Sequence, residues 1–135
     1  MRGDALEGGK VYIVDDDAAV RDSLTVLLET YELEVEAYES LGAFTRGYRP
    51  HPRACLILDH HMPNVTGLEF LASPEGHALS LPAILITGQN DREIRAQAIE
   101  IGVIAFLPKP IASDALIAAI GSALDGKAQA RRGAS

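Results

Sequence analysis

The chain of 135 residues has no tryptophan, only four tyrosines and three phenylalanines, and a single cysteine. One cysteine excludes an internal disulfide, and because Cys55 lies within an apolar run, we expect a small buried core residue there. Aliphatic side chains must therefore supply the hydrophobic core. The length is sufficient for one domain with a core of its own.

Long hydrophobic runs are missing as well. The longest, such as "AILI" at 83–86 and "VIAFL" at 103–107, fall far short of the ~20 residues of a membrane-spanning helix. The first ten residues lack the apolar stretch of a secretory signal. We therefore expect a soluble, cytoplasmic protein without a membrane partner. The net charge of −7 also argues against nucleic acid as a direct partner of this chain.

Short apolar runs alternate with segments of helical period. Strands are expected at 10–17, 33–40, 54–61, 83–89 and 102–110. Helical stripes lie between them, as with Val20, Leu24 and Leu28. This order predicts an α/β fold, with a parallel sheet covered by helices on both faces. Four of the strands are almost continuously apolar, which predicts that they are buried on both faces.

Local signals predict where the elements begin and end. Asp17 and Ser113 stand where helix N-caps are expected. Pro74 and Gly76 should interrupt the helix that follows the third strand. We expect an N-terminal extension at 1–9, the folded domain at 10–125, and a flexible tail or the start of a linker at 126–135.

The stretch "CLILDHHMP" at 55–63 raises a question, because an apolar strand ends abruptly in Asp59, His60 and His61. Three explanations are open from these residues alone. The histidines could be metal ligands, Asp59 could be a reactive carboxylate, or the polar cluster could mark where a strand reaches the surface. Adjacent side chains on an extended segment point apart, which disfavours a metal held by the two histidines and leaves His60 packed or solvated.

Four of the expected strands end in polar groups, at 15–17, Asp59, Thr87 and Lys109. In a parallel α/β sheet the carboxyl ends of the strands share one edge, where ligands bind. Neighbouring carboxylates repel one another, and Mg²⁺, which prefers oxygen ligands, relieves this repulsion. A carboxylate beside Mg²⁺ can attack phosphorus to give an aspartyl phosphate. A lysine ammonium and a threonine hydroxyl are suitable donors to the phosphate oxygens.

With these motifs in place, the segment 10–124 resembles the receiver domains of bacterial two-component response regulators. The resemblance rests on "VDDD" at 14–17, "LDHHMPNVTG" at 58–67, "ITG" at 86–88 and "LPKP" at 107–110. Its most specific part is the D-x-x-M-P-x-x-x-G pattern from Asp59 to Gly67. Within the family the sequence looks most like receivers of the nitrogen-fixation regulator type, which are usually joined to a helix-turn-helix output domain.

The resemblance implies a flavodoxin-like (βα)5 doubly wound sheet with strand order 2-1-3-4-5, as a single domain. It also implies a role for each polar group. Asp59 would be the phosphoacceptor. Mg²⁺ would be held by Asp16 directly, by Asp15 through water, by Asp59, and by the backbone carbonyl of His61. Phosphate oxygens would be bound by Thr87, Lys109 and the backbone N–H of Gly88.

Further roles follow from the same resemblance. Thr87 and Phe106 would form a switch that alters the surface of the fourth helix, fifth strand and fifth helix, and the bond before Pro110 would be cis. His61 and Gln89, each two residues past a key position, would tune the lifetime of the phosphoryl group. Two departures from the family are that Phe106 lacks the hydroxyl of the tyrosine found in many relatives, and that Ile111 stands where an aromatic residue is common.

The implied partner is a sensor histidine kinase or a phosphotransfer protein, with Asp17, Ala18 and Arg21 as candidate contacts. A phosphorylation-dependent homodimer, and a DNA-binding domain in a longer parent protein, are both compatible with the sequence. The chain would not be an enzyme, since it would catalyse only its own phosphorylation and dephosphorylation.

Three alternatives are weighed against this interpretation. A phosphohydrolase with an aspartate nucleophile typically has a second carboxylate where His61 stands. A flavodoxin-like cofactor carrier would need a loop that attracts phosphate, and "DDDAAV" at 15–20 would repel it. A pseudo-receiver that is never phosphorylated would act as an interaction module only.

Overall fold

A five-stranded sheet forms the centre of the computed structural model, which describes residues 6–88 and 92–125. The strands are β1 (Lys10–Val14), β2 (Glu34–Tyr38), β3 (Ala54–Asp59), β4 (Ala83–Thr87) and β5 (Ala105–Pro108). Every neighbouring pair is parallel. The strand order is β2-β1-β3-β4-β5, which confirms the predicted doubly wound fold.

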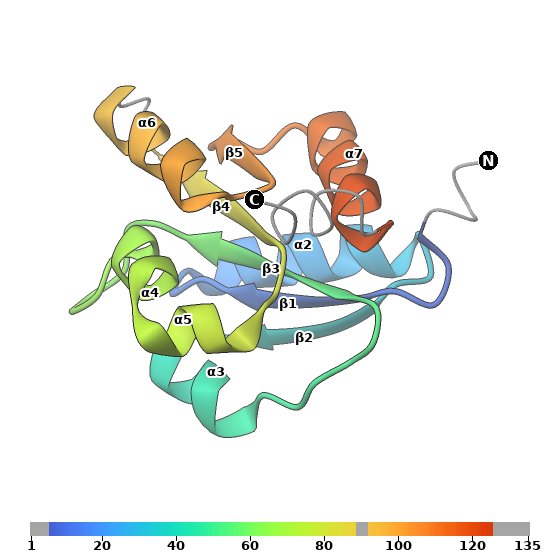
Figure 1. The fold of residues 1–135 in the computed structure, drawn as a ribbon. Helices are drawn as coiled ribbons and strands as arrows, with labels where there is room; N and C mark the ends of the chain where they lie inside the picture. The colour runs from blue at the N-terminus through green and yellow to red at the C-terminus, as the bar shows by residue number, and fades with distance from the viewer. Residues whose placement is uncertain (1–5, 89–91, 126–135) are drawn as a thin grey trace.

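Helices cover both faces of this sheet (Figure 1). They are α2 (Ala18–Glu29), α3 (Leu41–Gly47), α4 (Gly67–Ala72), α5 (Pro74–Leu79), α6 (Arg92–Ile101) and α7 (Ser113–Leu124). Helices α2 and α7 pack on one face, and the others lie on the opposite face. No helix of the described segments is long and apolar enough to cross a bilayer.

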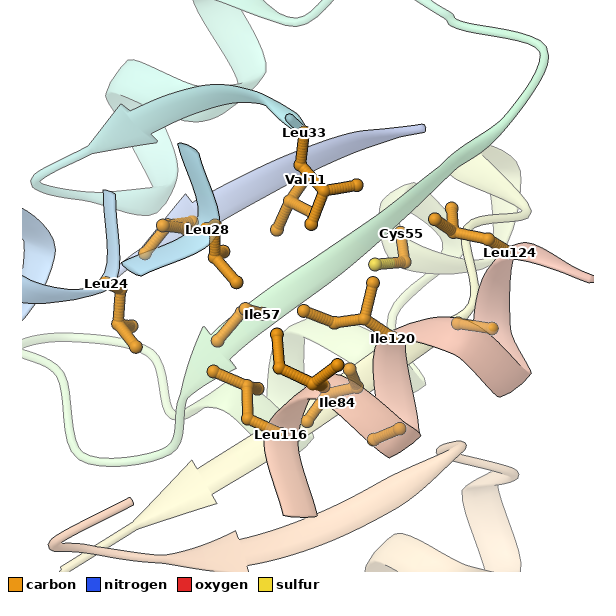
Figure 2. Close-up of a cluster of buried hydrophobic side chains, with 14 of the residues drawn as sticks. Val11, Leu24, Leu28, Leu33, Cys55, Ile57, Ile84, Leu116, Ile120 and Leu124 are labelled. Atoms are coloured by element: carbon orange, nitrogen blue, oxygen red, sulfur yellow. The ribbon is translucent and has the colours of Figure 1, made fainter. Parts of the chain in front are cut away.

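The alternation of side chains along each strand builds the two core layers. Ile57 and Ile84 point toward α2 and α7, where they pack with Leu28, Leu116 and Ile120 (Figure 2). The residues next to them along β3 and β4, Leu56, Leu58 and Leu85, belong to the second core layer, which packs against α3, α4 and α6. Cys55 belongs to the first layer, which confirms the prediction of a small buried core residue, and burial raises the pKa of its thiol to about 12.

The prediction of four strands buried on both faces is wrong for one of them. β1, β3 and β4 are buried along their whole length, but the residues of β5 are only half-buried or exposed. The reason is topological, because β5 lies at an edge of the sheet and has a strand neighbour on one side only.

The local signals are confirmed at two of three places. Asp17 is the N-cap of α2, and its carboxylate accepts a 2.9 Å hydrogen bond from the backbone N–H of Ala19. The helix after β3 is broken in two, with Pro74 at the start of α5, where it needs no N–H partner, whereas Gly76 lies inside α5 and interrupts no helix. The prediction for Ser113 is wrong, because the N-cap of α7 is Ala112, whose methyl group cannot accept a hydrogen bond.

Candidate functional site

The carboxyl edge of the sheet brings together the predicted polar residues. Asp59 and Thr87 are the last residues of β3 and β4, and Asp15 and Lys109 directly follow β1 and β5. Carboxylate oxygens of Asp15, Asp16 and Asp59 lie within 4.8 Å of one another. The ammonium of Lys109 is 3.2 Å from Asp15 Oδ2 and 3.5 Å from Asp59 Oδ1. Side chains from the ends of β1, β3 and β5 therefore form one cluster, and Thr87 ends the strand between β3 and β5.

Burial makes the negative charges of this cluster unfavourable unless positive charge compensates them. Asp15 and Asp59 are each 2% exposed, whereas Asp16 is exposed. Burial and the charge of Asp15 raise the pKa of Asp59, against the opposing effects of Lys109 and the backbone N–H of His61. Burial alone would lower the pKa of Lys109, but its ion pairs with the two carboxylates outweigh this and raise it. The site therefore needs more positive charge than Lys109 supplies.

The donor set fits a hard divalent cation. Asp59 Oδ1 is buried and, apart from its long 3.5 Å ion pair with Lys109, has no hydrogen-bond partner among the described residues. Two further carboxylates stand beside it, and carboxylate oxygens are the ligands that Mg²⁺ prefers in proteins.

The acidic loop after β1 is fixed by several hydrogen bonds. The Asp15 N–H donates to the carbonyl of Tyr38 at 3.1 Å, and the Asp17 N–H donates to Asp15 Oδ1 at 2.9 Å. Arg21 Nη1 donates to the main-chain carbonyl of Asp15 at 2.7 Å. Sequence reasoning assigned Arg21 only as a kinase contact and missed this bond. The acceptor lies six residues before Arg21 and outside the helix, so helical spacing gave no signal for this bond.

The ends of β4 and β5 are joined at the site. Thr87 is fully buried, and its carbonyl accepts a 2.8 Å hydrogen bond from the backbone N–H of Lys109. The peptide bond between Lys109 and Pro110 is cis. Phe106 pairs in register with Leu85 and packs, half-buried, against the core layer of the face that carries α6. Thr87 and Phe106 thus belong to two adjacent strands, and Lys109 directly follows the second of them. Gly88 is exposed at the end of β4, and Gln89 lies outside the described residues.

The two histidines differ in exposure, since His60 is buried and His61 is exposed. Their rings nevertheless lie edge to face with centroids 4.9 Å apart. The expectation that these side chains point apart is wrong, because the chain turns directly after β3. The turn is closed by the Met62 N–H, which donates to the carbonyl of His60 at 3.2 Å. His60 is packed rather than solvated.

Gly67 explains the end of the D-x-x-M-P-x-x-x-G pattern. Its N–H donates to the carbonyl of His60 at 3.0 Å, which brings the start of α4 against the tip of β3. A Cβ at this position would lie 2.7 Å from Leu85 Cδ1 and 2.9 Å from the carbonyl oxygen of Asp59. Only glycine allows this approach.

We therefore expect Gly67→Ala to lower the free energy of unfolding by about 1–3 kcal/mol, the usual cost of overpacking, and to slow any reaction at Asp59. Urea denaturation followed by circular dichroism measures the first effect. Gly42→Ala is the matched control, because its Cβ would meet the tip of the flexible Arg46 side chain at 3.3 Å and Ser40 Oγ at 3.9 Å, and no backbone atom. An equal, small effect of both substitutions would contradict the steric argument.

Asp59→Asn should stabilise the protein when Mg²⁺ is absent. A raised pKa means that the native state holds the Asp59 proton more tightly than the unfolded state, so ionisation costs stability as the pH rises. The amide removes this cost, and we expect a gain of about 1 kcal/mol at pH 7, the order of an unsatisfied buried polar group. The gain should vanish at acidic pH, where Asp59 is protonated. Thermal unfolding in EDTA at several pH values measures both effects, and a loss of stability at pH 7 would contradict the electrostatic account.

A shallow apolar groove borders the site between α2 and the loop after β5. Its lining includes Val20, Leu24, Pro110 and Ile111. Ile111 packs against the core layer of α2 and α7, so the aliphatic residue present where an aromatic is common extends an apolar surface beside Lys109.

Comparison with known proteins identifies the family. Residues 11–121 match the response regulator receiver domain. The chain belongs to this family. The transcriptional regulatory protein FixJ of Azorhizobium caulinodans is 36% identical over 122 residues, which are 90% of this chain and 58% of that protein. The transcriptional regulatory protein TdiR of Thauera aromatica is 37% identical over 114 residues, 84% of this chain and 50% of that protein.

Solved structures agree with this assignment. Full-length FixJ from B. japonicum superimposes with a TM-score of 0.78 at 33% identity, covering 88% of this chain and 59% of that one. The chain is therefore a receiver domain of two-component signalling proteins, and it is similar to the receivers of the FixJ type. The chain spans between about half and 58% of the length of the two curated relatives.

Proposed function

We propose that the chain is a phosphorylation switch whose phosphoacceptor is Asp59. One observation carries the proposal, which is the juxtaposition of a buried Asp59 with Asp15, Asp16 and Lys109 at the carboxyl edge of the sheet. Receiver domains work with histidine kinases, so the phosphoryl group would come from a phosphohistidine of a sensor kinase or phosphotransfer protein.

The receiver family binds Mg²⁺ in an acidic pocket, and in this chain the carboxylates of Asp15, Asp16 and Asp59 and the carbonyl of His61 would hold it. Mg²⁺, when bound, offsets the negative charge of the carboxylates and of the incoming phosphoryl group. Lys109 already compensates part of that charge, because its ammonium lies 3.5 Å from Asp59 Oδ1 and 3.2 Å from Asp15 Oδ2.

In the reaction a carboxylate oxygen of Asp59 attacks the phosphorus of the phosphohistidine. A P–O bond forms, the P–N bond breaks, and the leaving imidazole takes up a proton to remain a neutral ring. The product is an acyl phosphate on Asp59. The hydroxyl of Thr87, the ammonium of Lys109 and the N–H of Gly88 would donate to its oxygens.

The switch would follow from these contacts. Thr87 lies at the end of β4, and Phe106 lies beside that strand on β5. Movement of Thr87 toward the phosphoryl group would change the packing of Phe106, and with it the surface of α6, β5 and α7. This is a population shift between two packings, biased by phosphate contacts.

Hydrolysis of the acyl phosphate would return the chain to its starting state, with His61 and Gln89 tuning the rate. The chain would catalyse only these two reactions on itself. We place the folded domain at 10–125, between an extension and a tail or linker, and the protein in the cytoplasm.

The output belongs to the parts of the system outside this domain. The two curated relatives are transcriptional regulatory proteins that extend beyond the matched region, which is 58% and 50% of their lengths. We infer that the switched surface signals to an output domain, to a partner protein or to a second copy of the receiver.

The test is incubation of the chain with acetyl phosphate and Mg²⁺, followed by intact-mass measurement, with EDTA as the control. We expect one phosphoryl adduct, and none in EDTA. An absent adduct, under conditions that label another receiver, would favour a pseudo-receiver. Sustained turnover of a small phosphoester without an adduct would favour the phosphohydrolase.

A further inference from the structure

Arg21 makes a contact that the phosphoryl-transfer chemistry does not use. From α2 its Nη1 donates a 2.7 Å hydrogen bond to the main-chain carbonyl oxygen of Asp15. The side chain is half-buried, and within residues 6–88 and 92–125 it forms no ion pair with a carboxylate. The guanidinium therefore acts on the backbone of the acidic loop and not on its side chains.

The carbonyl in question belongs to the peptide group that joins Asp15 to Asp16. Because a peptide group is planar, fixing its oxygen fixes the direction in which the chain enters Asp16. The other hydrogen bonds of the loop are made by the N–H groups of Asp15 and Asp17, by the Asp15 carboxylate, and by the Asp17 carboxylate and carbonyl, which accept from the first turn of α2. Arg21 supplies the restraint on the peptide plane itself, through a charge-assisted bond of the stronger kind.

Asp16 depends on such a restraint more than its neighbours do. Asp15 is buried and paired with Lys109, and Asp17 is fixed as the N-cap of α2. Asp16 is exposed, yet its carboxylate must stay within 4.8 Å of those of Asp15 and Asp59 to complete a cation site.

We propose that Arg21 is a positioning residue for the cation site, which holds the peptide between Asp15 and Asp16 so that the Asp16 carboxylate faces the site. The inference rests on the proposed function, because it requires these carboxylates to bind Mg²⁺. Groups that orient a metal ligand without touching the metal commonly change metal affinity by about 10- to 100-fold.

Two simpler roles for Arg21 predict different results. If only its charge acted, removal of a nearby cation would let Mg²⁺ bind more tightly. If Arg21 only stabilised the first turns of α2, its removal would lower the melting temperature in EDTA and leave the Mg²⁺ affinity of the folded protein unchanged. Positioning predicts weaker binding, so the sign of the change separates the three.

The experiment is calorimetric titration of the full chain with Mg²⁺ for wild type, Arg21→Ala, Arg21→Gln and Arg21→Lys. Arg46→Ala is the matched control, because Arg46 is an exposed arginine in α3 and carries the same charge. We expect the dissociation constant to rise about 10-fold in the alanine and glutamine variants. The lysine variant, whose ammonium can still donate to a carbonyl, should lose less, and Arg46→Ala should match wild type.

A second measurement follows the rate of labelling by acetyl phosphate against Mg²⁺ concentration. The half-saturating concentration should rise by the same factor, while the rate at saturating Mg²⁺ stays close to that of wild type. If Arg21→Ala does not fold, Arg21→Gln carries the same test. An unchanged or tighter dissociation constant in the folded variant overturns the inference alone. Failure of wild type to bind Mg²⁺ overturns the proposed function as well.

Discussion

Asp59→Asn is expected to abolish the phosphoryl adduct formed with acetyl phosphate and Mg²⁺. The amide oxygen of asparagine is a poor nucleophile, so the variant has no reactive carboxylate at the end of β3. Asp59 ends β3, is 2% exposed and lies 3.5 Å from the ammonium of Lys109. Intact-mass measurement of the wild type and the variant, side by side, records the result.

The matched control is Asp17→Asn, a change of the same kind in the acidic loop. Asp17 is exposed and serves as the N-cap of α2, a role that asparagine fills about equally well. We expect this variant to be labelled like wild type. Labelling that survives Asp59→Asn and is lost in Asp17→Asn would reverse the assignment of the two carboxylates.

Lys109→Met is expected to lower the free energy of unfolding at pH 7 by about 2 kcal/mol when Mg²⁺ is absent. Breaking a fully buried ion pair typically costs about 3–5 kcal/mol, and the partial exposure of Lys109, 26% of its side chain, reduces that figure. The cost arises because Asp15 and Asp59 are left as neighbouring buried carboxylates. Urea denaturation in EDTA measures it.

The pH dependence of this loss has a definite sign. Lys109 is one of the groups that lower the pKa of Asp59, so its removal raises that pKa further. At acidic pH Asp59 is protonated and loses nothing when the ammonium is absent, so the part of the destabilisation that arises from Asp59 should disappear as the pH falls. Added Mg²⁺ should restore part of the stability at pH 7, because it replaces the missing positive charge.

A double-mutant cycle isolates this pair. In the Asp59→Asn background, Lys109→Met should cost clearly less than in wild type, since one of the two buried charges is already gone. Equal losses in both backgrounds would mean that Lys109 stabilises the fold through its packing and not through Asp59.

The position of the site could be predicted from the sequence because it follows from the topology of the sheet. Once five apolar runs alternate with helices, a parallel sheet places the ends of β1, β3, β4 and β5 at one edge. Asp15, Asp59, Thr87 and Lys109 were recognised because each stands at a strand end. The strand order itself came from the family resemblance.

The errors lie where a residue's environment depends on the rest of the fold. The apolar composition of β5 suggested full burial, but its edge position leaves it half-exposed. Ser113 was predicted to be the N-cap of the last helix, but it is the first helical residue, because Ala112 is the N-cap and makes no side-chain hydrogen bond. The bond from Arg21 to the Asp15 carbonyl depends on a loop conformation that no periodicity encodes.

The central claim, that Asp59 becomes an acyl phosphate, is tested most directly by trapping the product. The chain is labelled with acetyl phosphate and Mg²⁺, reduced with borohydride, which converts an aspartyl phosphate to homoserine, and mapped by peptide mass spectrometry. The account predicts homoserine at position 59 and unmodified aspartate at 15 and 16. Homoserine at position 15 or 16, or an adduct that resists reduction, would contradict it.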